Sequence, residues 1–382
     1  MKIENEIKAD PMAKLSALWS NLNIQFFPFV EEAIPDLEDW QKEFMACCAV
    51  IIDDDDFRQY KWCGNGRPPH SRLSIFKAFI LKHYLNLGTT KELSRLLRSS
   101  TSVCRICGWN FPSEVPDDAT FCRAFKQFSK DHIAEAIHRQ RGKEYLGDKV
   151  IFNVSHDSSK IEAREKGLSK ADKDRKRKTA KEAKANIPPK SDSKSRIDRQ
   201  RPRTAQVNFA ELPKDCDWGC KMNSKGKCEQ WKGYKLHLSV AQGDIPLLAF
   251  VSSASLHDSQ AIVPMMQQTS QTYTYLYDLA DAGYDAQGIR LASEELGHRP
   301  IIDENPRRGA PKVEDTGIAF VHMSTPEQTR YRNRTAVERV FGHLHDAHGG
   351  RTVRVRGHEK VMLHLMFGIL VIFAEQLLAL VK

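Results

Sequence analysis

The feature that most constrains the fold is a regular alternation of strand-like and helix-like segments after Lys149. Residues 150–154 form an apolar run typical of a buried strand, which we expect to end at Asp157. Residues 233–240 alternate with a period of two, and a glycine turn joins them to residues 245–251 as a hairpin. The remaining segments are predicted, in chain order, as a helix from Asp258, a strand at 273–279 that leads to Asp281, a helix at 286–296, a strand at 299–303, and helices at 325–344 and 358–381. This order predicts an α/β fold for residues 146–382.

Residues 1–145 show helical rather than strand-like spacing of apolar side chains. Residues 71–87 carry one apolar face, which predicts an amphipathic helix. Thr89 and Glu92 have the spacing of a capping box before a second helix, and Asp117 can cap a third. We therefore expect an all-helical domain over residues 1–145.

The third predicted helix of this domain carries a basic outer face, with Arg123 and Lys126 opposite its apolar side. Short helices that end in a basic face are typical of a helix-turn-helix unit, whose last helix enters a major groove of DNA. A small helical bundle with a solvated face fits these residues equally well. Arg123 and Lys126 are our candidate DNA contacts in this half of the chain.

A polar interval at about residues 164–215 separates the first predicted strand from the hairpin. Between residues 170 and 203 it is rich in Lys and Arg and almost lacks large apolar side chains. Such a composition cannot bury enough apolar surface to offset the entropy of ordering. We expect a basic, flexible insertion, either a solvated linker or an arm that lies along phosphates.

The charge balance favours a polyanionic partner. The chain has 58 Lys and Arg against 49 Asp and Glu, a formal net charge of +9, and a pI near 9.0. Nucleic acid is the commonest partner of such a surface.

Nothing in the sequence predicts export or a membrane span. The first residues mix acidic and basic side chains and lack the apolar core of a secretory signal, so we expect a cytoplasmic, nucleoid-associated protein. The apolar stretch at 361–381 is interrupted by His364, Glu375 and Gln376, and is therefore predicted to be a buried helix.

The nine cysteines are expected to be reduced thiols in this compartment. Cys104 and Cys107, with Cys122 further on, lack a fourth ligand for a structural zinc site. Cys216, Cys220 and Cys228 are also only three, and His237, which could supply a fourth ligand, lies in an apolar and aromatic context that suits a strand better. We therefore do not predict zinc at either group.

Three carboxylates have the placement that metal-assisted phosphoryl transfer requires. Asp157 and Asp281 follow strands that we expect to be neighbours, and Glu338 can reach them from a helix. Two-metal phosphoryl transfer needs hard anionic oxygens that converge on two Mg²⁺ ions, and carboxylates supply them. Asp258, Asp278 and Asp285 are competing candidates, but Asp278 lies inside a strand pattern and Asp285 can cap the next helix.

At these residues the chain resembles the DDE insertion-sequence transposases with a ribonuclease H-like core. The stretches that carry the resemblance are 156–163, 233–237 with 254–259, 280–285 and 331–342. The last is similar to a branch signature Tyr-x2-Arg-x3-Glu-x6-Lys, with Tyr331, Arg334 and Glu338 in place and His345 where the pattern has Lys. Weaker matches at 66–69, 91–93 and 115–121 resemble the helical DNA-binding region of that family.

The resemblance implies that Asp157, Asp281 and Glu338 bind Mg²⁺, for which Mn²⁺ would substitute, and catalyse strand cleavage and transfer. It implies double-stranded DNA as partner, both as terminal inverted repeats and as target, and a dimer on that DNA. Lys160, Tyr331, Arg334 and His345 are the expected DNA contacts of this half. Tyr331 and Arg334 lie on the helical face of Glu338 and could flank one phosphate.

Two other functions fit the same residues. One is a ribonuclease H-like nuclease that cuts DNA without transferring strands. The other is a transposase-derived DNA-binding regulator that has lost catalysis, for which His345 in place of Lys is the single sequence hint. Retention of all three carboxylates argues against the regulator.

Overall fold

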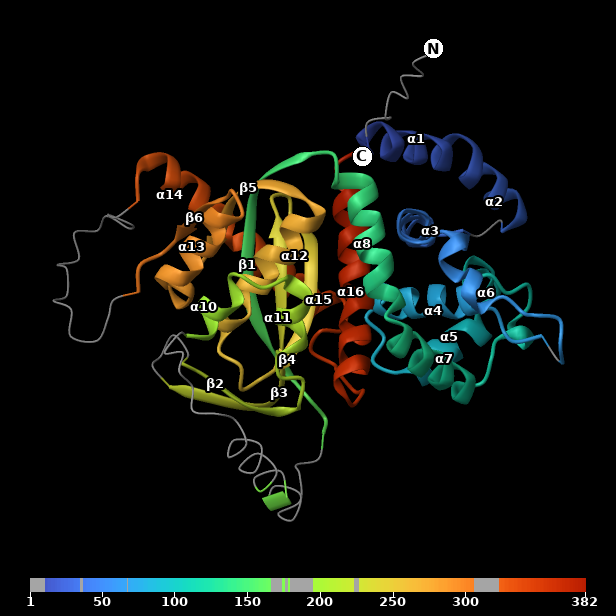
Figure 1. The fold of residues 1–382 in the computed structure, drawn as a ribbon. Coiled ribbons are helices and arrows are strands. Elements are labelled where there is room, and N and C mark those ends of the chain that lie inside the picture. Colours follow the sequence, from blue (N-terminus) through green and yellow to red (C-terminus); the bar gives the residue numbers. More distant parts are fainter. Residues whose placement is uncertain are drawn as a thin grey trace, which may run out of the picture.

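One mixed β-sheet organises the second half of the chain (Figure 1). The computed structural model describes residues 11–34, 37–66, 68–165, 195–222, 227–305 and 323–382, with 174, 175 and 178. The strands are β1 Val150–Glu162, β2 Asp217–Met222, β3 Cys228–Ala241, β4 Ile245–Ser253, β5 Thr274–Ala280 and β6 Arg299–Ile302. β3 pairs antiparallel with β1, β2 and β4, whereas β1, β5 and β6 are parallel neighbours. The predicted α/β class is confirmed.

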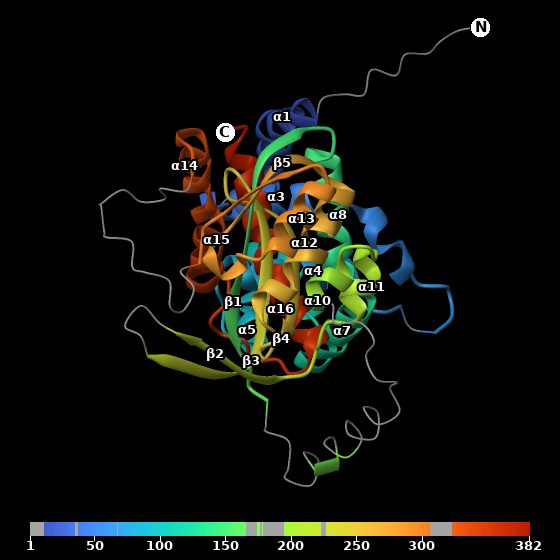
Figure 2. The ribbon, with the colours of Figure 1, turned by 60° about the vertical axis from the view of Figure 1, so that its left-hand side comes forward.

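Helices lie on both sides of this sheet. Figure 2 shows α14 and α15 on one side and α10 to α13 on the other. Their bounds are α10 Arg196–Gln200, α11 Ala205–Ala210, α12 Ile262–Thr272, α13 Gln287–Glu295, α14 Thr325–Tyr331 and α15 Thr335–Ala347. The single helix predicted at 325–344 is therefore broken, because a 3-10 turn, η6 (Arg332–Arg334), separates α14 from α15.

The structure explains why glycine stands at two positions of the sheet. The β3–β4 hairpin turns at Gly243 and Asp244, both with positive φ, so the predicted turn is confirmed. Gly233 pairs with Glu162 of β1 and Asp217 of β2. A Cβ on Gly233 would overlap the Ile161 carbonyl oxygen, so the close approach of β1 requires glycine there.

The first half of the chain is helical, as predicted. Its helices are α1 Pro11–Asn21, α2 Phe27–Ala33, α3 Asp39–Ile51, α4 Arg72–Tyr84, α5 Thr90–Ser99, α6 Thr101–Ile106, α7 Asp118–Asp131 and α8 Ile133–Leu146. Thr89 and Glu92 form the expected capping box of α5, and Asp117 caps α7 by accepting from the Thr120 amide. These caps satisfy amide groups that a helix start leaves without intrahelical partners.

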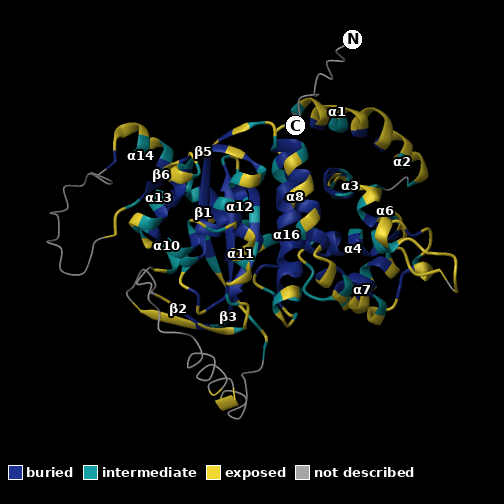
Figure 3. Cartoon of the chain, in the orientation of Figure 1, coloured by how far each residue is buried: buried dark blue, intermediate teal, exposed yellow. Residues whose placement is uncertain are grey.

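The C-terminal helix α16 (His358–Ala379) joins the two halves of the molecule. It packs on β4 and on α3, α4, α7 and α8, and Figure 3 shows it buried along most of its length. Its length and hydropathy would suit a membrane span, but 89% of that apolar window is buried within the protein. The predicted buried helix is therefore confirmed, and through it the helical region and the sheet share one hydrophobic core.

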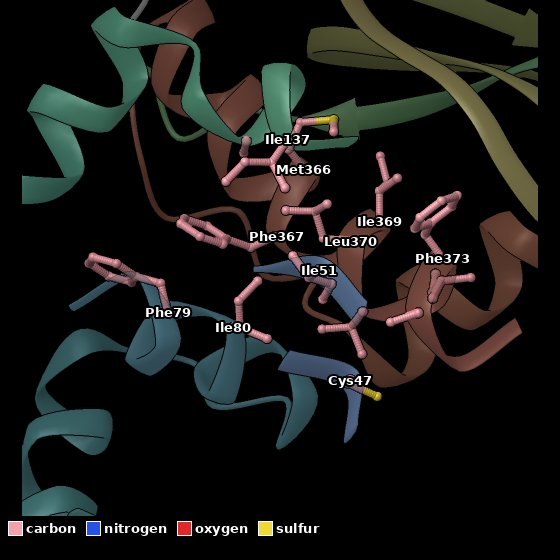
Figure 4. Close-up of a cluster of buried hydrophobic side chains, with 14 of the residues drawn as sticks. Cys47, Ile51, Phe79, Ile80, Ile137, Met366, Phe367, Ile369, Leu370 and Phe373 are labelled. Atoms are coloured by element: carbon pink, nitrogen blue, oxygen red, sulfur yellow. The ribbon is translucent and has the colours of Figure 1, made fainter. Parts of the chain in front are cut away.

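Side chains from four helices meet in this core (Figure 4). Phe367 of α16 lies with its ring centroid 5.0 Å from that of Phe76 and 5.4 Å from that of Phe79, both on α4. Ile51 of α3 and Ile137 of α8 are buried in the same cluster. The core thus depends on contacts between residues some 300 positions apart in the chain.

Two expectations need correction. The end of the predicted flexible insertion is structured, because α10 and α11 pack on α12, and Asn208 Nδ2 donates to Gln267 Oε1 at 2.8 Å. The rest of the interval, 166–194, lies almost wholly outside the described residues. Cys220 and Cys228 are not reduced thiols, since they form a disulfide between β2 and β3. Adjacent strands bring their Cα atoms to 6.3 Å, a normal spacing for such a bond.

Candidate active site

The sheet places Asp157 and Asp281 side by side. β1 and β5 pair in parallel with Ser155 opposite Leu279, so two residues further on Asp157 comes level with Asp281. β5 ends at Ala280, directly before Asp281. β1 does not end at Asp157 as predicted but runs on to Glu162, because β3 continues to pair with it. The two carboxylates therefore meet where β5 stops and β1 loses its neighbour on that side.

Charge and burial make this pair unusual. Burial first, and then the charge of Asp281, raise the pKa of Asp157 to about 7. Asp157 Oδ1 accepts from the Ser158 amide at 2.7 Å, and Asp281 Oδ1 accepts from the Gly283 amide at 2.8 Å. In the described part of the chain neither carboxylate forms an ion pair. The negative charge of the pair is therefore not neutralised by an ion pair within the described residues.

The three competing aspartates all have basic partners. Asp258 lies 2.9 Å from Lys235 Nζ, and Asp285 lies 2.9 Å from an Arg290 nitrogen. Asp278 is fully buried and lies within 3.0 Å of His156 and His298. These ion pairs favour Asp157 and Asp281 as the cation-binding carboxylates.

Asp278 contacts His156, the residue of β1 that directly precedes Asp157. Its carboxylate lies 2.8 Å from His156 Nε2 and 3.0 Å from His298 Nδ1, and accepts from Ser293 Oγ at 2.6 Å. Burial alone would raise the pKa of Asp278, but hydrogen bonds and charge from both histidines hold it well below its usual range. The network therefore fixes β1 against β5 immediately beside the carboxylate pair.

Glu338 is paired with Arg334 and not grouped with the two aspartates. It lies in the first turn of α15 with a half-exposed side chain, and its Oε1 is 2.8 Å from Arg334 Nη1. Ser155 Oγ donates to the Asn333 carbonyl at 2.9 Å and so fastens η6 to β1. Of the described residues, Asp157, Asp281 and Glu338 do not form a set with ligand spacing.

Tyr331 and Arg334 connect Glu338 electrostatically to the pair. The Arg334 guanidinium lies 5.7 Å from the centre of the Tyr331 ring, and its charge acts on both Glu338 and Asp157. Tyr331 is buried, which raises its pKa to about 12. The sequence placed Tyr331 and Arg334 on the helical face of Glu338. Arg334 does lie beside Glu338, whereas η6 interrupts the helix between Tyr331 and Glu338. Their contact with a phosphate stays a prediction.

The other predicted DNA contacts occupy different environments. Arg123 and Lys126 are exposed on α7. Lys160 is ion-paired with Glu229 and lies 3.8 Å from Glu162. His345 Nε2 is 2.9 Å from Ser159 Oγ, which ties α15 to β1, and burial with the nearby Arg351 charge lowers the pKa of His345. Both effects favour the neutral imidazole, and the predicted DNA contact of His345 stays a prediction.

A basic cavity that the sequence did not indicate lies between the helical region and the loop before α16. Its volume is about 480 Å³, and the basic side chains that line it are Lys82, Arg164, Arg354, Arg356 and Lys360. Lys82 is 6% exposed, and burial lowers its pKa to about 8. These residues come from three distant parts of the chain, at 82, 164 and 354–360, so no local sequence pattern could reveal the cavity.

The raised pKa of Asp157 leads to a stability prediction. Its folded pKa of about 7 exceeds the unfolded value of about 3.9, so the folded state binds the proton more tightly. Stability is therefore lost as the pH rises from about 4 to 7. Asp157→Asn should stabilise the metal-free protein by ~1–2 kcal/mol at pH 8, after allowance for solvent screening, and by almost nothing at pH 4.

Urea unfolding at the two pH values measures this difference. Asp285→Asn is the matched control, because it removes a partner of Arg290 and should destabilise the protein at pH 8. An Asp157→Asn protein that is no more stable than wild type at pH 8 would contradict the raised pKa of this carboxylate.

Two aspartates at a sheet edge, with a glutamate on a nearby helix, are the kind of carboxylate set that enzymes of phosphoryl transfer use. Comparison with family models agrees: residues 154–374 match the family described as "Transposase DDE domain", and residues 32–127 match "Transposase domain (DUF772)". The chain belongs to the DDE transposases of insertion sequences, as its sequence resemblance implied. No curated protein and no solved structure matches it significantly.

Proposed function

We propose that the protein binds the ends of its own insertion sequence and catalyses Mg²⁺-dependent strand cleavage and strand transfer. The observation that carries this proposal is the pairing of Asp157 and Asp281 on neighbouring strands without a basic partner for either in the described residues. We propose further that the sheet and its helices form a ribonuclease H-like core over residues 146–382, preceded by a DNA-binding domain over residues 1–145.

The donor set suits the proposed ion. Asp157, Asp281 and Glu338 offer only carboxylate oxygens, which Mg²⁺ prefers and which Mn²⁺ also accepts. Burial and then the charge of Asp281 raise the pKa of Asp157, and a bound cation would favour its ionised form against both effects. When bound, such ions would activate the attacking oxygen and stabilise the leaving oxygen.

Glu338 must change partner to complete this set. Its ion pair with Arg334 is half-exposed, and such pairs contribute little to stability. We propose that Glu338 turns toward the aspartates when DNA is bound. Arg334 is then released to hold a phosphate of the DNA beside the buried ring of Tyr331.

DNA binding is proposed for two basic surfaces. The exposed face of α7 carries Arg123 and Lys126, and the cavity at Lys82 adds Arg354 and Arg356. Lys and Arg at such positions neutralise phosphates and release counterions. Two element ends must be held together for transfer, so we propose a dimer on DNA.

A plasmid that carries the element's two ends tests the function. We expect Mg²⁺ to support cutting at the ends and joining of the cut strands to target DNA, whereas EDTA abolishes both. Cutting without joining would instead identify a nuclease, and binding without cutting a regulator. Either of these outcomes would overturn the proposed function.

A further inference from the structure

Three metal-ligating side chains meet where α15 and α16 pack together. His343 lies four residues before the end of α15, His348 directly follows that helix, and Glu375 comes from α16. In the part of the chain that the structure describes, they are the one group of three His, Cys, Asp or Glu whose ligand atoms lie within 4.8 Å of one another. The cluster plays no part in the proposed DNA chemistry.

The three ligand atoms have the spacing of a metal site. His348 Nε2 lies 3.2 Å from His343 Nε2 and 3.3 Å from Glu375 Oε2, and His343 Nε2 lies 3.8 Å from that same oxygen. Ligands at about 2.0–2.2 Å from a tetrahedral zinc ion stand about 3.3–3.5 Å apart. One face of a tetrahedron therefore fits these three atoms.

A backbone contact fixes the state of the central histidine. His348 Nδ1 lies 3.1 Å from the His83 carbonyl oxygen, which can only accept, so Nδ1 carries the proton and donates. In the neutral ring, Nε2 then presents its lone pair toward His343 and Glu375. A hydrogen bond from the ring nitrogen that does not face the metal is the usual means by which proteins orient a histidine ligand.

The buried oxygen Oε2 of Glu375 has no hydrogen-bond partner among the described residues. Glu375 Oε2 is shielded from solvent, and no hydrogen bond reaches it from the described residues, although His348 Nε2 is only 3.3 Å away. Buried polar atoms are nearly always satisfied. An ion between the three side chains would satisfy Glu375 Oε2 and both imidazole lone pairs together.

We propose that His343, His348 and Glu375 bind one divalent transition-metal ion of the zinc class. Two imidazole nitrogens and one carboxylate oxygen suit Zn²⁺ far better than Mg²⁺, so this site differs from that of Asp157 and Asp281. The side chain of His343 is 39% exposed, which leaves the fourth position to water.

The ion would clip α15 to α16. Gly368 brings the helices close, since a Cβ there would meet the His348 carbonyl oxygen at 2.6 Å. Glu338 lies on the same helix as His343, five residues earlier. The clip therefore holds the helix that carries Glu338 onto the shared core, whether or not the proposed DNA reaction is correct.

Equilibrium dialysis of the untagged, full-length protein against Zn²⁺, after treatment with EDTA, tests the site. We expect one equivalent of Zn²⁺ in the wild type, and at least 10-fold weaker binding in His343→Gln. Co²⁺ in place of Zn²⁺ should give the intense visible absorption of a four-coordinate ion in the wild type alone. His343 is half-exposed, so its variant should fold, and circular dichroism checks this. Glu375→Gln is a second variant, in which we also expect weaker binding of Zn²⁺.

Matched controls separate the possible outcomes. His257→Gln removes an exposed histidine outside the cluster and should leave Zn²⁺ binding unchanged. The competing account is an ion pair between protonated His348 and Glu375, which predicts no uptake of metal. Absence of Zn²⁺ binding in the wild type, or equal binding in folded His343→Gln and Glu375→Gln, would overturn the proposal.

Discussion

Asp157→Asn, Asp281→Asn and Glu338→Gln should each lower the rate of strand cleavage by at least ~10³-fold while preserving binding to the element ends. Each amide keeps nearly the same size but removes the anionic ligand that Mg²⁺ requires, and losses of this order follow when charge stabilisation of a transition state is removed. Binding should be preserved because it comes from basic side chains and phosphate contacts. Single-turnover cleavage and end-binding titrations measure the two effects.

Asp285→Asn is the matched control for cleavage. It lies four residues after Asp281 and is already paired with Arg290, so its variant should retain measurable activity. An active Asp281→Asn protein, or an Asp285→Asn protein as inactive as Asp281→Asn, would refute the choice of the second carboxylate.

Phe367→Ala should lower the free energy of unfolding by ~3–5 kcal/mol. Phe367 is fully buried, and its ring meets those of Phe76, Phe79 and Phe125 from the helical region. Because α16 belongs to a core shared with the sheet, both halves should lose stability together. Phe111→Ala, at a position that is 58% exposed, should have an effect near zero.

Urea unfolding followed by tryptophan fluorescence and by circular dichroism measures this loss. We expect one transition, coincident for the two probes and shifted as a whole in Phe367→Ala. Two separate transitions, with only one of them shifted, would contradict a shared core.

Local chemistry allowed much of the fold to be predicted. The capping box of Thr89 and Glu92, the Asp117 cap and the hairpin turn at Gly243 all depend on neighbours within a few residues. The adjacency of Asp157 and Asp281 followed from strand order, since both carboxylates were placed at the same edge of one sheet.

Tertiary contacts determined the features that could not be predicted. β1 extends past Asp157 because β3 pairs with it, although the polar run at Asp157 and Ser158 resembles a strand end. Residues at 195–215 looked too polar to fold, yet α12 supplies partners for α10 and α11.

The site was predictable only in part for the same reason. Asp258 and Asp278 could be set aside firmly only once their partners Lys235, His156 and His298 were known. His343 and His348 are five residues apart, a spacing that does not place both on one helix face, so their meeting with Glu375 on another helix gave no sequence signal.

Anomalous X-ray scattering from a crystal of the protein with Mn²⁺ and a cleaved element end tests the central claim most directly. Our account predicts Mn²⁺ between the carboxylates of Asp157 and Asp281, with Glu338 turned from Arg334 to join them. Mn²⁺ absent from Asp157 and Asp281, or Glu338 still paired with Arg334 while the DNA end occupies the site, would contradict it.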